Sequence, residues 1–319
     1  MVRCAFCDAD FEAGPGDVLL VCPYCGTAQT TAGAKFKDHY MIRVHFSQSE
    51  AQRILLDWCS KQLGAPQDLP VAARFVKAKL IFYPFWISRV DADTRYKGLG
   101  KDARFHGEWP QRPGAYKHID FFYKPESGRF QRRYEINVPG VEDIDEDIKN
   151  FPIPTRAKEY FSHAHAEEYD GKVLHSQVSE EQARELARKM AYDRQTALIL
   201  EEVDKIESRD DDIDVGETFL IHVPVWELEY RYGSRTYKAS VSASTGYVIE
   251  SKYPRSMAFR GMAIGGGLIN LAIGAGLLYL ALKVGILVGG GIVSGGILTA
   301  LGLSLLYKGV SRKEAKEKI

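Results

Sequence analysis

Residues 219–250 of the chain read FLIHVPVWELEYRYGSRTYKASVSASTGYVIE. Apolar and polar residues alternate along two runs, 219–231 and 236–250, and turn signals stand at Gly233-Ser234 and Thr245-Gly246. Alternation with a period of two is typical of strands that bury one face, and such dipeptides favour reversals between strands. The stretch therefore predicts an antiparallel meander.

A helix is expected just before this meander. Ser179 and Gln182 have the spacing of a capping box, in which each side chain caps the backbone of the other. The residues that follow place one apolar face at helical spacing: Ala183, Leu186, Ala187, Met190 and Ala191. Together these patterns predict a helix packed on one face of a small antiparallel sheet.

The same pattern occurs earlier in the chain. The block Ile81-Phe-Tyr-Pro84-Phe-Trp86 matches Ile221-His-Val-Pro224-Val-Trp226 140 residues later, and Ser49 with Gln52 has the capping-box spacing of Ser179 with Gln182. We therefore expect an α+β chain with two related helix-plus-antiparallel-meander modules. The first would span residues 35–138, and residues 139–255 would hold a linker and the second. Trp86 and Trp226 should be equivalent, buried core anchors.

Three segments are expected to lie outside the strands. Residues 98–118 read as a surface loop inserted in the first module, and residues 139–178 as an acidic, proline-bearing linker with apolar anchors. The acidic run Asp210–Asp214 is expected to be a solvated loop before a strand, because it lacks the spacing and the glutamate of a calcium-binding loop.

The N-terminus carries a metal-binding pattern. Cys4-Ala-Phe-Cys7 and Cys22-Pro-Tyr-Cys25 are separated by fourteen residues. Each C-x-x-C turn supplies two thiolates, so the two turns complete a tetrahedral Cys4 site with no open position for catalysis. We therefore predict a zinc ribbon over residues 1–34 that binds one structural Zn²⁺, whose binding supplies the folding free energy of this small segment. Gly26 should take the left-handed backbone of such a turn.

The charge of the ribbon argues against nucleic acid as its partner. Residues 1–38 contain three basic and five acidic side chains, and the whole chain carries 42 basic and 42 acidic residues. Binding to phosphates needs a basic stripe, which is missing here. A structural role or a contact with protein fits the ribbon better.

The C-terminal part is apolar. Residues 261–282 and 284–307 contain no charge and count 22 and 24 residues, enough for each to cross a hydrocarbon core of roughly 30 Å. Lys283 and Gly285 would mark the turn between them. We predict a transmembrane hairpin over residues 256–308 and a basic tail over 309–319. The alternative is a buried helix pair in a soluble protein.

Basic flanks predict the orientation of this hairpin. Arg255 and Arg260 precede it, and five basic residues follow it: Lys308, Arg312, Lys313, Lys316 and Lys318. The positive-inside rule then places both termini in the cytoplasm, as a two-pass protein of the cell membrane. Glycines four apart, Gly285 with Gly289 and Gly291 with Gly295, favour close packing either within the hairpin or between copies of the chain.

Two resemblances follow from these motifs. The run 223–250 (VPVWELEYRYGSRTYKASVSASTGYVIE), with its preceding helix, resembles the PepSY-like module over about residues 175–252 and more loosely over 45–135. The whole layout of ribbon, two tryptophan blocks and hydrophobic hairpin resembles a group of uncharacterised prokaryotic zinc-ribbon membrane proteins. The resemblance implies a fold and a location in the membrane, but no reaction.

No catalytic constellation is apparent in the sequence. His163 and His165 with His175 form the one local histidine cluster, which is either a metal pair on an extended strand or a set of surface histidines near a helix start. Cys59 lies on the apolar side of the first helix and reads as a buried, inert thiol.

These observations favour a non-enzymatic, membrane-anchored cytoplasmic adaptor that binds a protein partner at the lipid bilayer. One alternative is a membrane-bound enzyme or peptidase regulator that uses the cleft between the modules, which pKa-perturbed groups near His163, His165 or His222 would favour. Another is a membrane-associated nucleic-acid-binding protein. A contiguous basic face would favour it, built from Lys124, Arg129, Arg132 and Arg133.

Overall fold

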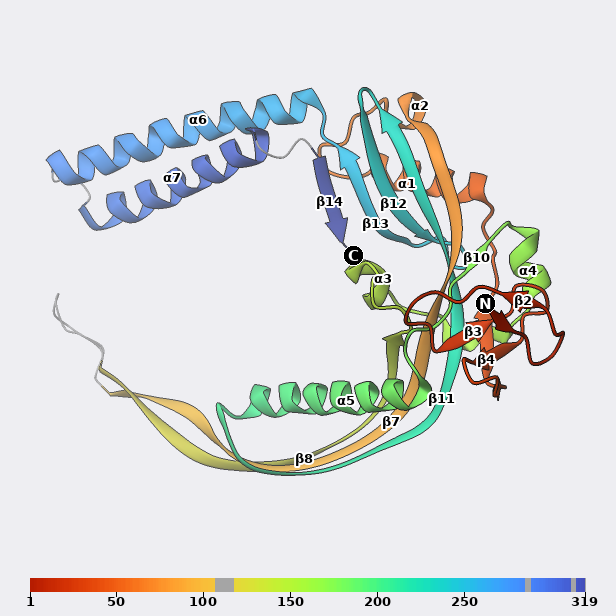
Figure 1. Cartoon of the computed structure of the whole chain (residues 1–319). Coiled ribbons are helices and arrows are strands. Elements are labelled where there is room, and N and C mark those ends of the chain that lie inside the picture. Colours follow the sequence, from red (N-terminus) through yellow and green to blue (C-terminus); the bar gives the residue numbers. More distant parts are fainter. Residues whose placement is uncertain (107–117, 285–287, 311–313, 319) are drawn as a thin grey trace.

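The computed structural model describes residues 1–106, 118–284, 288–310 and 314–318, and it combines helices and strands in one mixed architecture. A central body carries two long projections that extend in the same direction (Figure 1). One is the helical hairpin near the C-terminus, and the other is an arm of very long strands with one helix along it.

The N-terminal segment forms two small sheets. The first pairs β1 (Val2–Arg3) with β2 (Asp10–Phe11), and the second has three antiparallel strands. The strands of the second sheet are β3 (Leu19–Val21), β4 (Ala28–Thr30) and β5 (Lys35–Phe36).

The remaining strands form one mixed sheet, in which β7 and β11 lie at the centre. Its long members are β7 (Arg74–His106), β8 (His118–Pro139) and β11 (Lys205–Tyr232). Its shorter members are β6 (His39–Ile42), β9 (Lys158–Tyr160), β10 (Lys172–Val173), β12 (Arg235–Ser242), β13 (Val248–Pro254) and β14 (Glu314–Lys318). The meander predicted over 219–250 is present as β11, β12 and β13, which pair in antiparallel order.

The two tryptophan blocks pair with each other. β7 and β11 run antiparallel, and Tyr83 lies opposite Val223. From this central pair the register places Trp86 opposite Leu220 and Trp226 opposite Leu80. Because related residues are 140 positions apart, Tyr83 and Val223 are each other's counterparts, and the paired blocks are related by a local pseudo-twofold axis through them.

The helices of the two halves are exchanged across this axis. Helix α1 (Gln48–Ser60) packs on β11, β12 and β13, which all come from the second half. Helix α5 (Glu180–Glu202) packs on β7 and β8 of the first half as well as on β11. The expectation that each helix packs on the meander of its own module is therefore wrong for α1. The sequence patterns predicted the helices and strands, but they did not predict which strands each helix packs on.

Both tryptophans reach the start of the exchanged helix. The indole Nε1 of Trp226 donates to the carbonyl of Phe46 at 2.9 Å, just before Ser47, the N-cap of α1. The indole Nε1 of Trp86 donates to the carbonyl of Val178 at 2.9 Å, just before Ser179, the N-cap of α5. Both rings are buried, as expected for core anchors.

The helix starts are partly as predicted. Ser179 and Gln182 form the expected capping box of α5. In α1 the capping box is made by Ser47 and Glu50, two residues before the expected pair Ser49 and Gln52.

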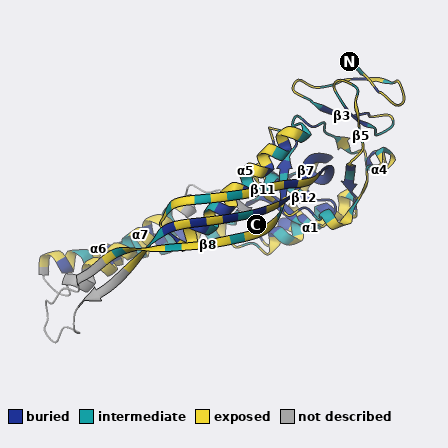
Figure 2. Cartoon of the chain, turned by 90° about the horizontal axis from the view of Figure 1, so that it is seen from below, coloured by how far each residue is buried: buried dark blue, intermediate teal, exposed yellow. Residues whose placement is uncertain are grey.

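Two segments expected to be loops are strands. Residues 98–106 continue β7 and pair with β8, and residues 210–214 lie within β11. Residue 118, the last of the expected loop, begins β8, and residues 107–117 lie outside the described residues. The expectation was wrong because charged residues also occur in strands with one face in solvent. Helix α5 covers one face of the arm, and the other face carries the charged side chains of each strand. Figure 2 shows this alternation of buried and exposed residues along the arm.

The segment 139–178 is ordered in short elements. These are α3 (Glu146–Asn150), η1 (Thr155–Ala157), β9, α4 (His163–Glu168) and β10. Its apolar side chains join the core on the face of the sheet opposite α1: Ile144, Ile148, Phe151 and Ile153. A short α2 (Leu69–Ala72) precedes β7.

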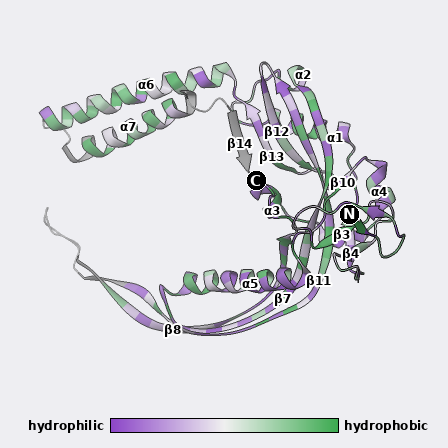
Figure 3. Cartoon of the chain, in the orientation of Figure 1, coloured by the Kyte–Doolittle hydropathy of each residue, from purple (hydrophilic) through white to green (hydrophobic). Residues whose placement is uncertain are grey.

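Two apolar helices form the second projection, and Figure 3 shows their hydrophobic colouring. These are α6 (Met257–Tyr279), continued by η2 (Leu280–Val284), and α7 (Val288–Val310). Among the described residues one helix, Met257–Lys283, is long and apolar enough to cross a membrane, which alone is weak support for a span. Within α7, the apolar stretch Ile292–Tyr307 is shorter than a membrane span requires. Helix length therefore does not support two passes.

Glycines allow α6 and α7 to approach closely. A Cβ at Gly267 would lie 3.0 Å from the carbonyl oxygen of Gly302, and one at Gly274 would lie 3.0 Å from that of Gly295. Gly295 thus packs within the hairpin, one of the two alternatives for the glycine pairs. Gly285, expected at the turn, lies outside the described residues.

Candidate metal centre

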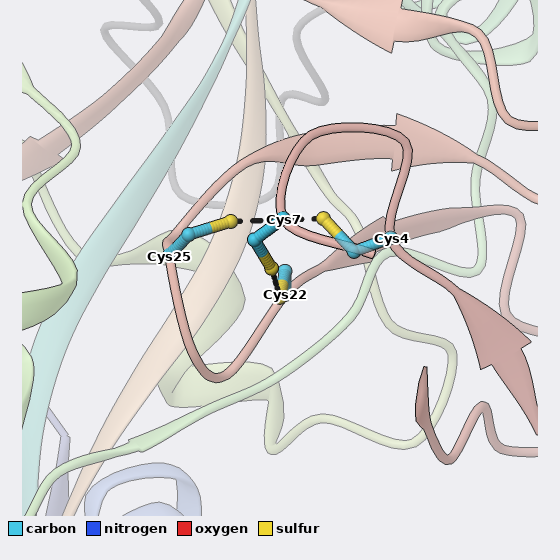
Figure 4. A group of neighbouring side chains, drawn as sticks. All are labelled: Cys4, Cys7, Cys22 and Cys25. Atoms are coloured by element: carbon cyan, nitrogen blue, oxygen red, sulfur yellow. Dashed lines mark hydrogen bonds between the residues drawn. The ribbon is translucent and has the colours of Figure 1, made fainter. Parts of the chain in front are cut away.

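The four N-terminal cysteines converge on one point. The Sγ atoms of Cys4 and Cys25 are 3.6 Å apart, those of Cys7 and Cys22 are 3.7 Å apart, and all four lie within 4.8 Å of one another (Figure 4). A tetrahedral ion with Zn–S bonds of 2.3 Å would separate its ligands by about 3.8 Å. The predicted cluster is therefore present, and its geometry fits one tetrahedral metal ion.

Each C-x-x-C turn is built in the same way. The N–H of Phe6 donates to the sulfur of Cys4 at 3.4 Å, and the N–H of Tyr24 donates to the sulfur of Cys22 at 3.5 Å. Such donors stabilise the thiolate form, because they place a positive dipole end against the charge. The backbone of both turns is thus arranged for anionic sulfur ligands.

A left-handed residue follows the second cysteine of each turn. Gly26 has a φ of +72°, as expected, and Asp8 has a φ of +60°. The equivalence of the two turns was the signal that could have predicted Asp8. At Gly26 a side chain is also excluded by space, because a Cβ would lie 3.0 Å from that of His163 and 3.3 Å from the ring of Phe161.

The ribbon is joined to the body through strand and core contacts. The N–H of Leu19 donates to the carbonyl of Ser176 at 3.0 Å, and the N–H of Ser176 donates back at 2.9 Å. Phe36 packs edge-on against Trp86, with ring centroids 5.3 Å apart. Leu19 lies in the same core as Trp86 and α5. The four-cysteine segment is therefore held in a fixed position on the sheet.

His163, His165 and His175 do not converge, which argues against the metal pair, one of the two alternatives for them. His163 and His165 lie on α4 rather than on a strand. His165 accepts a hydrogen bond from the N–H of Val44, and His175 accepts one from the N–H of Val21, both at 3.1 Å. Burial lowers the pKa of His175. Within the described part of the chain these three histidines form no metal-ligand group, and two of them serve as acceptors for backbone donors.

A buried histidine pair was not predicted. His39 Nε2 and His222 Nδ1 are 2.9 Å apart, and His222 Nε2 lies 2.9 Å from the carbonyl oxygen of Leu174. A carbonyl only accepts, so Nε2 of His222 carries its proton and Nδ1 accepts from His39. Phe161 stacks on the His39 ring at 4.2 Å. The signal in the sequence was a histidine where the related block has Phe82.

Burial keeps this pair neutral. It lowers the pKa of His222 to about 4, and it lowers the pKa of His39 well below its usual value, with a further effect of His222. The pair therefore bridges β6 and β11 as two uncharged rings near neutral pH.

Cys59 is a buried thiol, as expected. It lies 3.3 Å from the Oγ of Ser251 and 4.0 Å from the hydroxyl of Tyr230. Burial raises the pKa of the Cys59 thiol, which disfavours the nucleophilic thiolate.

The candidate basic face is partly neutralised by neighbouring carboxylates. Arg129 pairs with Asp93 through Nε at 2.7 Å, and Arg133 pairs with Asp91 at 2.7 Å. Asp212 lines the same surface hollow as Arg132. Two of the four predicted cations are thus committed to carboxylates on β7, which weakens the attraction for phosphates.

A cavity of about 370 Å³ lies between α3 and the sheet. Its wall includes Tyr83, whose hydroxyl donates to Glu227, and burial raises the pKa of this tyrosine. Carboxylate oxygens of Asp145, Asp147 and Glu250 lie within 4.8 Å of one another beside it. The cavity was not foreseen, because its walls come from segments far apart in the sequence.

Comparison with protein-family models, curated proteins and solved structures finds no match for this chain. Its function is therefore argued from its own residues.

Proposed function

We propose that the chain is a non-enzymatic adaptor anchored in the cell membrane, whose ribbon and α/β body bind a protein partner at the cytoplasmic face. The observation that carries the proposal is helix Met257–Lys283, since only 17% of its most apolar window is buried. An apolar helix whose surface is left mostly uncovered by its own chain is stable in lipid.

The ribbon would hold one structural Zn²⁺ through Cys4, Cys7, Cys22 and Cys25. Four thiolates at these separations suit zinc, and they would leave no position open for water or substrate. The ion would supply folding free energy to a segment with a small core, and the cysteines would serve structure rather than catalysis.

Two passes with both termini in the cytoplasm are part of the proposal. Strand β14 follows α7 and pairs with β13, which directly precedes α6. The chain before and after the hairpin thus lies together, as expected if α6 and α7 cross the membrane and return. The basic flanks of the hairpin favour the cytoplasm for that side. We also propose that the two halves are PepSY-like repeats, on the strength of the paired tryptophan blocks.

Labelling in intact cells tests the topology. An impermeant maleimide should react with Lys283→Cys, at the outer turn, and should not react with Arg312→Cys. Reaction at both positions would mean a single pass, and reaction at residue 312 alone would reverse the orientation.

Capture of a partner tests the adaptor role. The full chain, solubilised in detergent, should retain a reproducible set of proteins. A Cys22→Ser/Cys25→Ser variant should lose those that need the ribbon. The adaptor role would be contradicted if the wild-type chain, in the membrane and with zinc bound, captured no more proteins than an unrelated membrane protein does.

The cavity beside α3 favours a second candidate function, a membrane-bound enzyme or peptidase regulator. Tyr83, Glu227 and Glu250 all line it. If the purified chain catalyses a reaction and the Glu227→Gln variant does not, this candidate is supported over the adaptor.

A further inference from the structure

Two aromatic side chains of the ribbon are explained neither by the metal centre nor by the core. Phe6 and Tyr24 occupy the same place, third in each C-x-x-C turn, and each is 67% exposed. Their backbone N–H groups donate to sulfur, but any residue other than proline would supply that donor. The two rings are therefore not needed to bind the ion.

We propose that these rings, together with the carboxylate of Asp8, form a docking surface, the knuckle face, for an arginine- or lysine-containing segment of a partner protein. Asp8 is exposed and pairs with Arg3 at 3.4 Å, an ion pair in solvent that a cation of the partner can replace. The inference rests on the proposed function and names the surface that the adaptor uses. A bound metal ion would fix both turns, so the rings are held in place before binding and lose little freedom on it. Exposed aromatic residues of this kind dominate binding at protein interfaces.

The charge of the ribbon selects a cationic partner. Residues 1–38 carry three basic and five acidic side chains, and Asp8, Asp10 and Glu12 are all exposed. A Zn²⁺ ion with four thiolates adds two further negative charges to this end of the ribbon. A basic peptide is therefore attracted to the ribbon, which also presents the two rings.

One ring already accepts a cation. The ammonium group of Lys35 lies 5.0 Å from the centroid of Phe6, within the range of a cation–π interaction. In the part of the chain that the structure describes, no cation faces the ring of Tyr24. The knuckle face thus offers one open aromatic face, and a second one that a flexible lysine can vacate.

Single-stranded nucleic acid is the competing ligand, because bases also stack on exposed aromatic rings. That mode needs a basic groove to follow the phosphates, whereas the ribbon is acidic. The observations therefore favour the basic peptide.

The test uses the full chain in detergent micelles, with its zinc content measured in every sample. Fluorescence anisotropy would follow a labelled peptide of alternating arginine and glycine, a matched peptide with glutamate in place of arginine, and an oligothymidine strand. The wild-type chain should bind the arginine peptide, more weakly at high salt, and should bind neither of the others.

Variants then assign the binding to the knuckle face. Phe6→Ala/Tyr24→Ala should weaken binding of the arginine peptide at least about tenfold while zinc content stays at that of the wild type. Phe6→Leu/Tyr24→Leu, which keeps apolar bulk without the aromatic face, should weaken it as well. The exposed Tyr123→Ala, on the arm, is the matched control and should bind as the wild type does.

Three results would overturn the inference. They are a zinc-loaded wild-type chain that ignores the arginine peptide, alanine and leucine variants that bind it as well as the wild type, and tighter binding of oligothymidine than of the peptide. All three leave the zinc and the membrane anchor untouched. A wild-type chain without zinc would instead overturn the proposed ribbon, and the knuckle face with it.

Discussion

At the scale of single residues, Trp226 carries the contact between the exchanged halves. Its ring is 4% exposed, lies in one core with Leu55 and Cys59 of α1, and donates to the carbonyl of Phe46. Trp226→Ala should lower the free energy of unfolding by about 3–5 kcal/mol, because it leaves a cavity between α1 and the sheet.

Thermal melting of the detergent-solubilised chain measures this loss. Trp226→Phe is the matched control: it keeps most of the ring and removes only the donor to Phe46, so its melting temperature should fall much less. An unchanged melting temperature in Trp226→Ala would mean that the ring contributes nothing to the packing of α1.

The buried pair of His39 and His222 predicts acid sensitivity. In the unfolded chain each histidine would titrate near 6.5, whereas burial lowers the pKa of His222 to about 4 in the folded chain. Between these values the unfolded state binds a proton that the folded state does not. The free energy of unfolding should therefore decrease as the pH is lowered through this range, by roughly 1.4 kcal/mol per pH unit for each such histidine.

Denaturant titrations at pH 7, 6 and 5 check this slope. His222→Gln should flatten it, because a glutamine amide can donate to Leu174 and accept from His39 without titrating. His45→Gln, at an exposed position, controls for removal of a histidine, and any acid release of zinc is common to all three proteins. Equal slopes in the wild type and His222→Gln would exclude the pair as the cause.

At the scale of elements, the ribbon and the sheet differ in what stabilises them. The small core of the ribbon includes two of the four clustered cysteines, Cys4 and Cys22, whereas the body has three large apolar cores of its own. Removal of zinc by a chelator should therefore unfold the ribbon and leave the body folded.

Hydrogen exchange would resolve the two parts of the chain. After chelation, amides of residues 1–34 should lose protection, while those of β11 and β12 keep it. Native mass spectrometry should show one zinc ion per chain before chelation and none in Cys22→Ser/Cys25→Ser. Protection of the ribbon amides in a metal-free, reduced chain would remove the case for a structural ion.

The hairpin offers a matched pair of glycines. A Cβ at Gly274 would lie 2.5 Å from the Oγ1 of Thr299, whereas one at Gly276 meets nothing within 4 Å. Gly274→Leu should force α6 and α7 apart and lower the melting temperature in micelles by several degrees. Gly276→Leu should leave it nearly unchanged.

Size-exclusion chromatography of the same variants separates the two uses of glycine. If Gly276→Leu alters the oligomeric state, then the open face of α6 packs between copies of the chain. If neither variant changes stability, close approach of α6 and α7 is not what holds the hairpin together.

The elements show which local signals were sufficient. Gly233 and Gly246 both have positive φ at the predicted turns, and Ser179 caps α5 as its spacing indicated. The strands at 98–106 and 210–214 were missed because charged residues disfavour strands, whereas here residues 98–106 pair with β8 and residues 210–214 pair with β7. The four cysteines were predictable because their chemistry depends on local spacing. The His39–His222 pair was not, because its partners lie 183 residues apart.

At the scale of the whole molecule, the exchange of helices makes the two halves depend on each other. The apolar face of α1 packs mainly on strands that follow residue 204, together with α2 and part of β7, and Trp86 is covered by α5 and the ribbon. No spacing within either half encodes this arrangement, because it arises when β7 and β11 pair across the pseudo-twofold axis. The sequence repeat predicted two similar units, but the contacts between these units are what cover the apolar faces of both.

This dependence predicts the behaviour of split chains. Residues 1–178 alone would expose the face of α1 that includes Leu55, and residues 179–319 alone would expose Trp226. Each fragment should therefore aggregate or fail to melt cooperatively, because each leaves a large apolar face in water. Fragments produced together should assemble, regain a cooperative transition and shift the tryptophan fluorescence toward the blue. If residues 179–255 alone showed that transition and that shift, the second module would fold independently. Helix α1 would then dock on the meander of an already folded domain rather than share a core with it.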